Sequence, residues 1–237
     1  MKKSILFIFT ACFLFTTSCS DFLDEEHKTK YSSEYVFGTP EGLKLAVNAL
    51  YALQRYYAND TENATIFALE RGTDLAVTNG GTGNFYGIYD PNYLKPSASQ
   101  VGFMWRTMYQ IIGKANEIIA AAEDLEDTPS LRATVSEAKC FRAQSYFLLY
   151  RTFDRIWLNI QPTTAENVND PRDFHAASEK EVFDLIYEDL EYAITNLDWV
   201  SDEAGRFTQA AARHMKAKAA LWLKDWDTTL EQVEEIE

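Results

Sequence analysis

Cys19 is the cysteine whose sequence surroundings point most directly to a chemical modification. It follows two lysines near the start of the chain, an apolar run over residues 5–15 and three small residues. This order is typical of a bacterial lipoprotein signal, in which the chain is cut before the cysteine and the thiol is acylated. The apolar run is too short to span a bilayer. The sequence therefore predicts a lipoprotein signal peptide at residues 1–18 and lipidation at Cys19. Thr16 stands where such signals usually have leucine, so ordinary secretion with cleavage nearby stays open.

Flat aromatic rings and short hydrogen-bonding side chains gather between Asn59 and Gly102. Five of the ten glycines of the chain fall between residues 72 and 87, which predicts a long ordered loop. Sugar rings have apolar faces that stack on aromatic side chains, while their hydroxyls bond to amides and carboxylates. The loop is therefore a candidate glycan-binding site, with the alternative that its rings anchor it to the core. The predicted ligand-binding residues are Asp74, Asn84, Tyr86 and Tyr89.

Charge and motif spacing argue against several other classes of function. The formal net charge is −14 and no cluster of Lys and Arg stands out, so nucleic acid is not a predicted partner. The glycines lack the spacing of phosphate-binding loops, and His27, His175 and His214 lack the spacing of metal or catalytic motifs. No catalytic residue, metal or cofactor is therefore predicted. A glycoside hydrolase that uses two carboxylates stays open, because 36 acidic residues always supply a pair.

Cys140 is the only other thiol expected in the mature chain, because Cys12 lies inside the predicted signal peptide. An intrachain disulfide is then impossible. A lone cysteine in an apolar helix, with no positioned histidine, is expected to be a small buried residue.

The stretch from Glu137 to Phe153 carries apolar or small residues on nearly every face over a helical length. Such a helix belongs inside a protein, so helices before and after it are expected to cover it. Arg142 interrupts this surface, and a buried arginine needs a carboxylate or carbonyl partner.

Periodicity and capping residues predict the helices around this central one. A Thr-Pro pair at residues 39–40 starts the first, and apolar residues from 101 to 122 trace the second. Ser130 is expected to cap the central helix, and Ser178 with Glu181 forms a capping box for the next helix.

A tight helical hairpin is predicted near the C-terminus. Thr208 starts its first helix, and its second follows a break at Asp225. The expected architecture is all-α, built from tetratricopeptide-like hairpins with a long Gly- and aromatic-rich loop region. The last helix ends on a run of glutamates without a capping residue, so the fold is expected to be incomplete at the C-terminus. Its apolar residues are Trp226, Leu230, Val233 and Ile236.

Several separated segments together resemble the SusD/RagB family of nutrient-binding outer-membrane lipoproteins. They cover nearly the whole mature chain, and they are residues 19–26, 41–54, 70–77, 113–119, 137–153, 178–197 and 205–226. Residues 20–38 are acidic and polar without a clean period, which predicts a tether at residues 19–38. The resemblance implies that a SusD-like helical domain follows at residues 39–237. It also implies a lipid-anchored, surface-facing outer-membrane protein that captures glycans or similar nutrients and covers a TonB-dependent (SusC-like) β-barrel transporter.

The chain departs from the family pattern after the central helix. The family commonly continues Phe-Gly-x-x-Pro-Leu, whereas this chain reads Phe153, Asp154, Arg155, Ile156, Trp157 and Leu158, so a different turn is expected there. Three functions follow from these observations: a glycan-binding protein without chemistry of its own, a carboxylate-based glycoside hydrolase, and a helical scaffold that binds only protein.

Overall fold

The computed structural model describes residues 31–59, 99–171 and 174–237. The chain divides into a unit from Met1 to Ser32 and a unit from Ser33 to Glu237, and the helices described below all belong to the second unit. No helix in the described part of the chain is long and apolar enough to cross a membrane.

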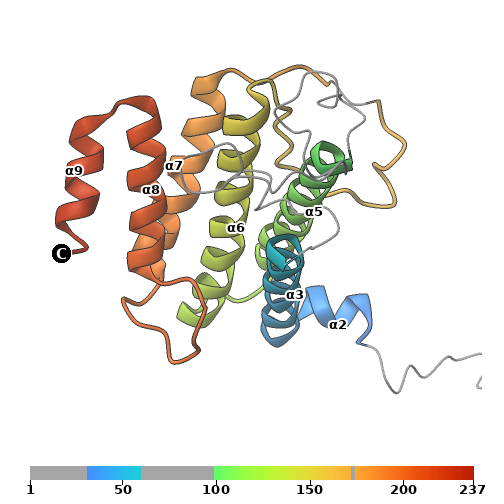
Figure 1. Cartoon of the computed structure of the whole chain (residues 1–237). Coiled ribbons are helices and arrows are strands. Elements are labelled where there is room, and N and C mark those ends of the chain that lie inside the picture. The colour runs from blue at the N-terminus through green and yellow to red at the C-terminus, as the bar shows by residue number, and fades with distance from the viewer. Residues whose placement is uncertain (1–30, 60–98, 172–173) are drawn as a thin grey trace, which may run out of the picture. The chain divides into compact units, whose positions relative to one another are not determined.

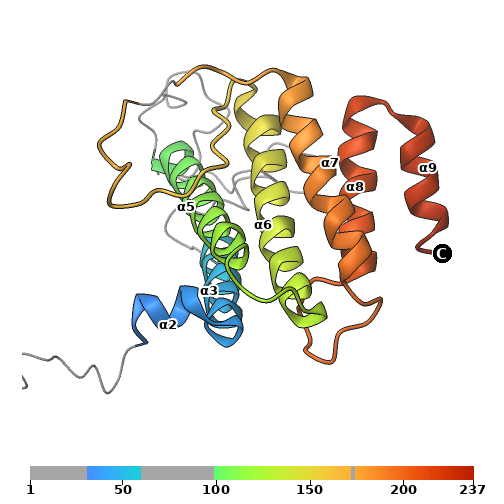
Figure 2. The ribbon, with the colours of Figure 1, turned by 180° about the vertical axis from the view of Figure 1, so that it is seen from behind.

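The described residues form helices joined by turns and loops, without a β-strand (Figure 1). In chain order the helices are α2 (Ser33–Gly38), α3 (Pro40–Asn59), α5 (Ser99–Ala122), α6 (Pro129–Phe153), α7 (Glu179–Asn196), α8 (Gln209–Leu223) and α9 (Trp226–Glu234). Each helix from α5 onward packs against the next one in sequence, as Figures 1 and 2 show from opposite sides. This arrangement confirms the predicted all-α class.

Helix α6 lies at the centre of the bundle, as the apolar Glu137 to Phe153 stretch predicts. It contacts α5 and α7 along its length and also touches α3 and α8. Phe141, Tyr146 and Leu149 are fully buried, and each such side chain contributes roughly 1.5–3 kcal/mol of hydrophobic stabilisation. Cys140 is also fully buried, and burial raises the pKa of its thiol well above the usual value. A buried protonated thiol is unreactive, which agrees with the structural role predicted for it.

The N-terminal caps of the helices are those predicted, with one exception. The Ser178 and Glu181 capping box is present, and Thr39 accepts the N–H of Gly42 at 3.0 Å. The cap predicted at Ser130 is wrong, because Thr128 caps α6 by accepting the N–H of Leu131 at 3.1 Å. Pro129 takes the first helical position, so the residue before it becomes the cap, by the same Thr-Pro rule that starts α3.

The predicted tether at residues 19–38 includes a helix at its C-terminal end. Its last six residues, Ser33–Gly38, form α2 and pack on α3. The contact requires Gly42, because a Cβ atom there would overlap the carbonyl oxygen of Tyr35. A residue without a side chain therefore lets the two backbones approach each other.

Helices α8 and α9 form the predicted tight hairpin. Lys224 takes the left-handed conformation with a φ of 60°, and the N–H of Asp225 reaches the carbonyl of Ala220 at 2.9 Å. The face of α9 that packs on α8 is polar, with Gln232 buried against Arg213. The apolar residues Trp226, Leu230 and Val233 are instead exposed.

Candidate functional site

The site residues predicted from the sequence lie outside the described residues. These are Cys19, Asp74, Asn84, Tyr86 and Tyr89. Their roles stay predictions, and the candidate site that follows lies in the part of the chain that the structure describes.

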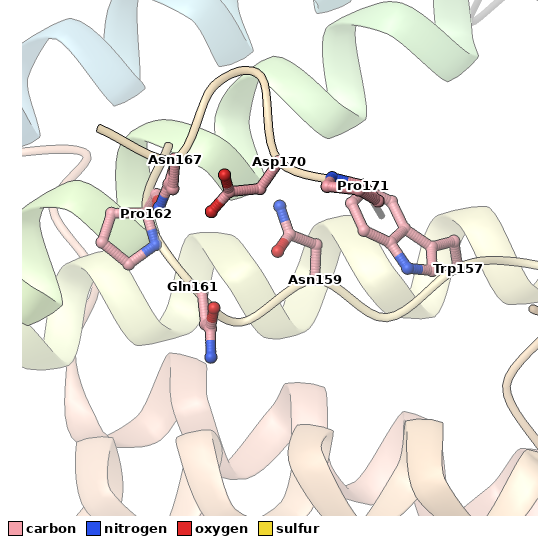
Figure 3. Close-up of a pocket in the computed structure, with 7 residues that line it drawn as sticks. All are labelled: Trp157, Asn159, Gln161, Pro162, Asn167, Asp170 and Pro171. Carbon is pink, nitrogen blue, oxygen red and sulfur yellow. The ribbon is translucent and has the colours of Figure 1, made fainter. Parts of the chain in front are cut away.

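A hollow of about 300 Å³ lies in the connection between α6 and α7 (Figure 3). This volume is at the lower end of the range for small-molecule sites, so the hollow suits part of a small ligand. The described residues that line it are Trp157, Asn159, Gln161, Pro162, Asn167, Asp170 and Pro171.

Asp154 turns the chain out of α6 and into this connection. Its backbone has a φ of 61°, and its N–H bonds to the carbonyl of Tyr150 at 2.9 Å. The family pattern described above has glycine at this position, and glycine adopts a positive φ without the steric cost of a Cβ atom. Asp154 thus adopts a backbone conformation that glycine favours, and the different turn expected from the sequence stays a prediction.

Two tyrosines from neighbouring helices fix the backbone of the wall that follows. The hydroxyl of Tyr109 donates to the carbonyl of Trp157 at 2.8 Å and accepts its N–H at 3.0 Å. The hydroxyl of Tyr146 does the same for Asn159, with both distances 2.8 Å. Each hydroxyl thus satisfies both backbone groups of one residue, as a neighbouring strand would. The side chains of Trp157 and Asn159 remain available to line the hollow.

A chain of buried polar groups also hydrogen-bonds to the backbone of this wall. The amide nitrogen of Asn116 donates to the carbonyl of Asn159 at 2.7 Å, and its oxygen accepts from Arg142 at 2.8 Å. Arg142 makes two further bonds to the carboxylate of Asp189, at 2.7 and 2.8 Å, and Lys139 adds a third at 2.8 Å. The predicted need of Arg142 for a carboxylate partner is therefore confirmed.

The environment of Arg142 favours its protonated, charged form. Burial alone lowers the pKa of its guanidinium, but the hydrogen bonds and charge of Asp189 raise that pKa above the ordinary value. Burial likewise raises the pKa of the Tyr146 hydroxyl, so it stays protonated and keeps its role as a donor. Arg142 therefore stays charged and Tyr146 stays protonated near neutral pH.

Asn167 shapes the opposite wall. Its side-chain oxygen accepts the N–H of Thr164 at 2.8 Å, and its amide nitrogen donates to the carbonyl of Pro162 at 3.0 Å. Its own carbonyl accepts the N–H of Asp170 at 3.1 Å. These bonds close a compact turn that presents Asp170 to the hollow.

Three polar side chains at the hollow have no side-chain partner in the part of the chain that the structure describes. Asn159, Gln161 and Asp170 have no side-chain hydrogen bond to any described residue. In Figure 3 the side chains of Asn159 and Asp170 point into the same space, with the ring of Trp157 at one end. Phe174 packs against Trp157 with 4.8 Å between ring centroids and is 71% exposed, which extends the aromatic surface beyond the hollow.

This arrangement suits binding by stacking and hydrogen bonding. Hydrolysis of a glycoside needs two carboxyl groups about 5–9.5 Å apart across the scissile bond. Asp170 is the only carboxylate among the described residues of the lining. Across residues 31–59, 99–171 and 174–237, no group of three or more His, Cys, Asp or Glu side chains could hold a metal ion.

The two prolines and the Asn and Thr residues of segment 154–174 predict only a connection across the surface, so sequence reasoning misses this site. One signal is present in the sequence, because Trp157, Asn159 and Gln161 alternate with Leu158 and Ile160 at the period of an extended segment. The tyrosines that hold the segment come from other helices, and sequence spacing gives no hint of their pairing.

Solved structures share this fold at low sequence identity. A laminarin-binding SusD-like protein superposes with a TM-score of 0.71 and 25% identity, over 83% of this chain and 43% of that one. A SusD-like carbohydrate-binding protein from Bacteroides fragilis superposes with a TM-score of 0.68 and 17% identity, over 85% of this chain and 40% of that one.

Curated relatives are similar over almost the whole chain. A SusD-like protein from Bacteroides ovatus is 28% identical over 96% of this chain and 40% of its own length. The SusD-like protein P38 from Formosa agariphila is 27% identical over 96% of this chain and 44% of its own length. This chain thus spans less than half the length of these relatives.

A family model also matches the sequence directly. It describes SusD-like proteins as starch-binding and associating with the outer membrane, and it matches residues 21–221. That match includes the helices from α2 to α7, nearly all of α8, and the hollow between α6 and α7. The chain therefore belongs to the SusD-like family.

Proposed function

We propose that this chain is part of an outer-membrane protein that binds a glycan for import. The observation that carries the proposal is the hollow, where Trp157, whose backbone is held by Tyr109, lies beside three polar side chains that have no side-chain hydrogen bond to the described residues. The laminarin-binding relative, at 25% identity, supports a glycan as the ligand.

Each lining residue has a distinct role in this proposal. The ring of Trp157 stacks on the apolar face of one sugar, and Phe174 offers a second ring to the next sugar along the chain. Asn159 and Gln161 both donate and accept, which matches hydroxyl groups, and Asp170 accepts from them. The protein binds and releases its ligand without changing it.

Location and partnership rest on the sequence and the family. Lipid at Cys19 would hold the protein to the outer membrane facing the surface, and the nutrient would pass to a TonB-dependent β-barrel of the SusC-like class. Cys19→Ala should move the protein from the membrane to the soluble fraction. Retention on membranes after a salt wash would contradict the anchor, and a pull-down from detergent extract that recovers no large barrel would contradict the partner.

A titration calorimetry screen tests the glycan site. The purified protein is titrated with laminarin, starch and xyloglucan fragments, and the products are analysed for cleavage. Trp157→Ala should weaken the best ligand by roughly 1–3 kcal/mol, as expected for loss of a stacking ring. Trp226→Ala is the matched control, because Trp226 is 57% exposed on α9 at the opposite edge of the bundle (Figure 1).

The predicted loop site enters the same screen. Tyr86→Ala and Tyr89→Ala, with Asp74→Ala and Asn84→Ala, test whether the loop between residues 59 and 102 contributes to the same ligand. Loss of glycan affinity in the loop variants and in Trp157→Ala would show that the loop and the hollow both contribute to binding. Full affinity in the loop variants, with loss in Trp157→Ala, would assign binding to the hollow alone.

A protein-binding scaffold is the second candidate function. The observation that favours it is the exposed apolar surface of α8 and α9, where Trp222, Trp226 and Leu230 are 47%, 57% and 59% exposed. A scaffold without a glycan site would show no affinity for any glycan in the screen.

A further inference from the structure

The described lining of the hollow carries a charge of one sign. Asp170 is acidic, and the other described lining residues are neutral. Arg172 and Asp173, which follow Pro171 in sequence, lie outside the described residues and have opposite charges. Among the described residues, the lining therefore has one carboxylate, which accepts hydrogen bonds, and no basic side chain.

From this lining we propose that the hollow selects neutral glycans over glycans that carry carboxylates or sulfates, and that Asp170 determines this specificity. The inference rests on the proposed function, because it names the substrate class of the same site.

Hydrogen-bond chemistry is the first reason. An ionised carboxylate only accepts hydrogen bonds, and Asp170 has no side-chain partner among the described residues. A sugar hydroxyl donates to it in a strong charge-assisted bond. The carboxylate of a uronic acid or a sulfate group has no proton to give, so both acceptors would be left facing each other.

Electrostatic repulsion is the second reason, and it adds to the first. Asp170 is exposed, and two like charges a few ångströms apart near a protein surface repel strongly enough at low salt to lower affinity by about tenfold. The amides of Asn159 and Gln161 can turn to donate or accept, so they tolerate either kind of group. The discrimination therefore comes from Asp170 rather than from the amides.

A matched pair of ligands tests this inference. The neutral glycan that binds best in the calorimetric screen is compared with the same glycan after oxidation of its primary hydroxyls to carboxylates. We expect the oxidised form to bind at least about tenfold more weakly at low salt. The gap should narrow as ionic strength rises, because salt screens exposed charges.

Two variants separate the local charge from the charge of the whole protein. Asp170→Asn should improve binding of the oxidised glycan by about tenfold while binding of the neutral glycan falls or stays the same. Asp227→Asn changes the net charge equally, but it lies on α9 at the far edge of the bundle, so it should leave the gap unchanged (Figures 1 and 2).

The outcomes distinguish this inference from the proposed function. Equal affinity for the neutral and the oxidised glycan would overturn the selectivity while glycan binding stands. An equal gain from Asp227→Asn would overturn the role of Asp170. Failure of every neutral glycan to bind would overturn both the selectivity and the proposed function.

Discussion

Asp189 is the residue on which the polar interior of the bundle depends. It is fully buried and pairs with both Arg142 and Lys139 across α6 and α7. Asp189→Asn leaves two buried cations without this counter-charge, so it should lower the free energy of unfolding by about 3–5 kcal/mol. Urea denaturation measures the loss. Asp184→Asn is the control, because its pair with Lys180 is exposed and should cost about 0.5 kcal/mol or less.

Tyr146 tests the link between the interior and the hollow. Tyr146→Phe removes the hydroxyl that bonds both backbone groups of Asn159 and leaves its N–H unpaired. We expect a loss of about 1–3 kcal/mol in unfolding free energy, together with weaker glycan binding. Tyr150→Phe on the same helix removes only an exposed bond to Glu179 and should change neither quantity. Equal effects of the two variants would show that the wall does not depend on Tyr146.

For single residues, the sequence predicts that a buried charge requires a partner, but it does not predict which residue the partner is. A buried Arg142 with a carboxylate partner is predictable, because an unpaired charge in a core is costly. Asp189 and Asn116 could not be chosen, since they lie 47 and 26 residues away from Arg142 in sequence and only packing brings them to it. The side chains of Asn159 and Asp170 are visible in the sequence, but the turn that brings them together is not.

At the scale of elements, the end of α6 carries local strain. Asp154 adopts a φ of 61°, which costs a residue with a Cβ atom roughly 1–2 kcal/mol. Asp154→Gly should therefore raise the midpoint of urea unfolding, with a gain of about 1 kcal/mol after the greater entropy of the unfolded chain is counted. Asp154→Ala keeps the Cβ atom and should give no gain. A stabilising Asp154→Ala would show that the gain has another source.

The N-terminus of α7 gives a pH-dependent contribution. The side-chain hydrogen bond from Ser178 and the bond from its backbone N–H lower the pKa of Glu181 in the folded protein. A lowered folded pKa means that this stabilisation is present above the unfolded value, near about 4.3, and is lost as pH falls through the folded value. Thermal unfolding of the wild type and of Glu181→Ala should differ at about pH 7 and converge in acid. A gap that is constant with pH would contradict this account.

Elements were predictable where one local rule applied. The caps at Thr39, Ser178 and Thr208 follow from short-range hydrogen bonding, and the structure confirms them. The cap at Ser130 was wrong because the proline beside it takes precedence. The apolar stripe of α9 does not mark its inward face, because tertiary contacts bury Gln232 and leave Trp226 and Leu230 exposed.

At the scale of the whole molecule, the fold class was predictable and the location of the hollow was not. Helical periodicity, small residues on α8 and the apolar central helix are sufficient to predict an all-α array of hairpins. The hollow comes from a connection without helical periodicity, whose shape depends on Tyr109, Tyr146 and Asn116 in two helices. Such a site becomes visible only once the helices have been placed.

The most direct test of the central claim is NMR of the tryptophan indole groups during a glycan titration. The chain has five tryptophans, so selective labelling gives a short spectrum, and Trp157→Phe assigns the signal of interest. The best ligand of the calorimetric screen should shift the Trp157 indole signal and leave that of Trp226 unchanged, because Trp157 lines the hollow and Trp226 is exposed on α9. A glycan that binds, saturates and leaves the Trp157 signal in place would contradict the assignment of the site.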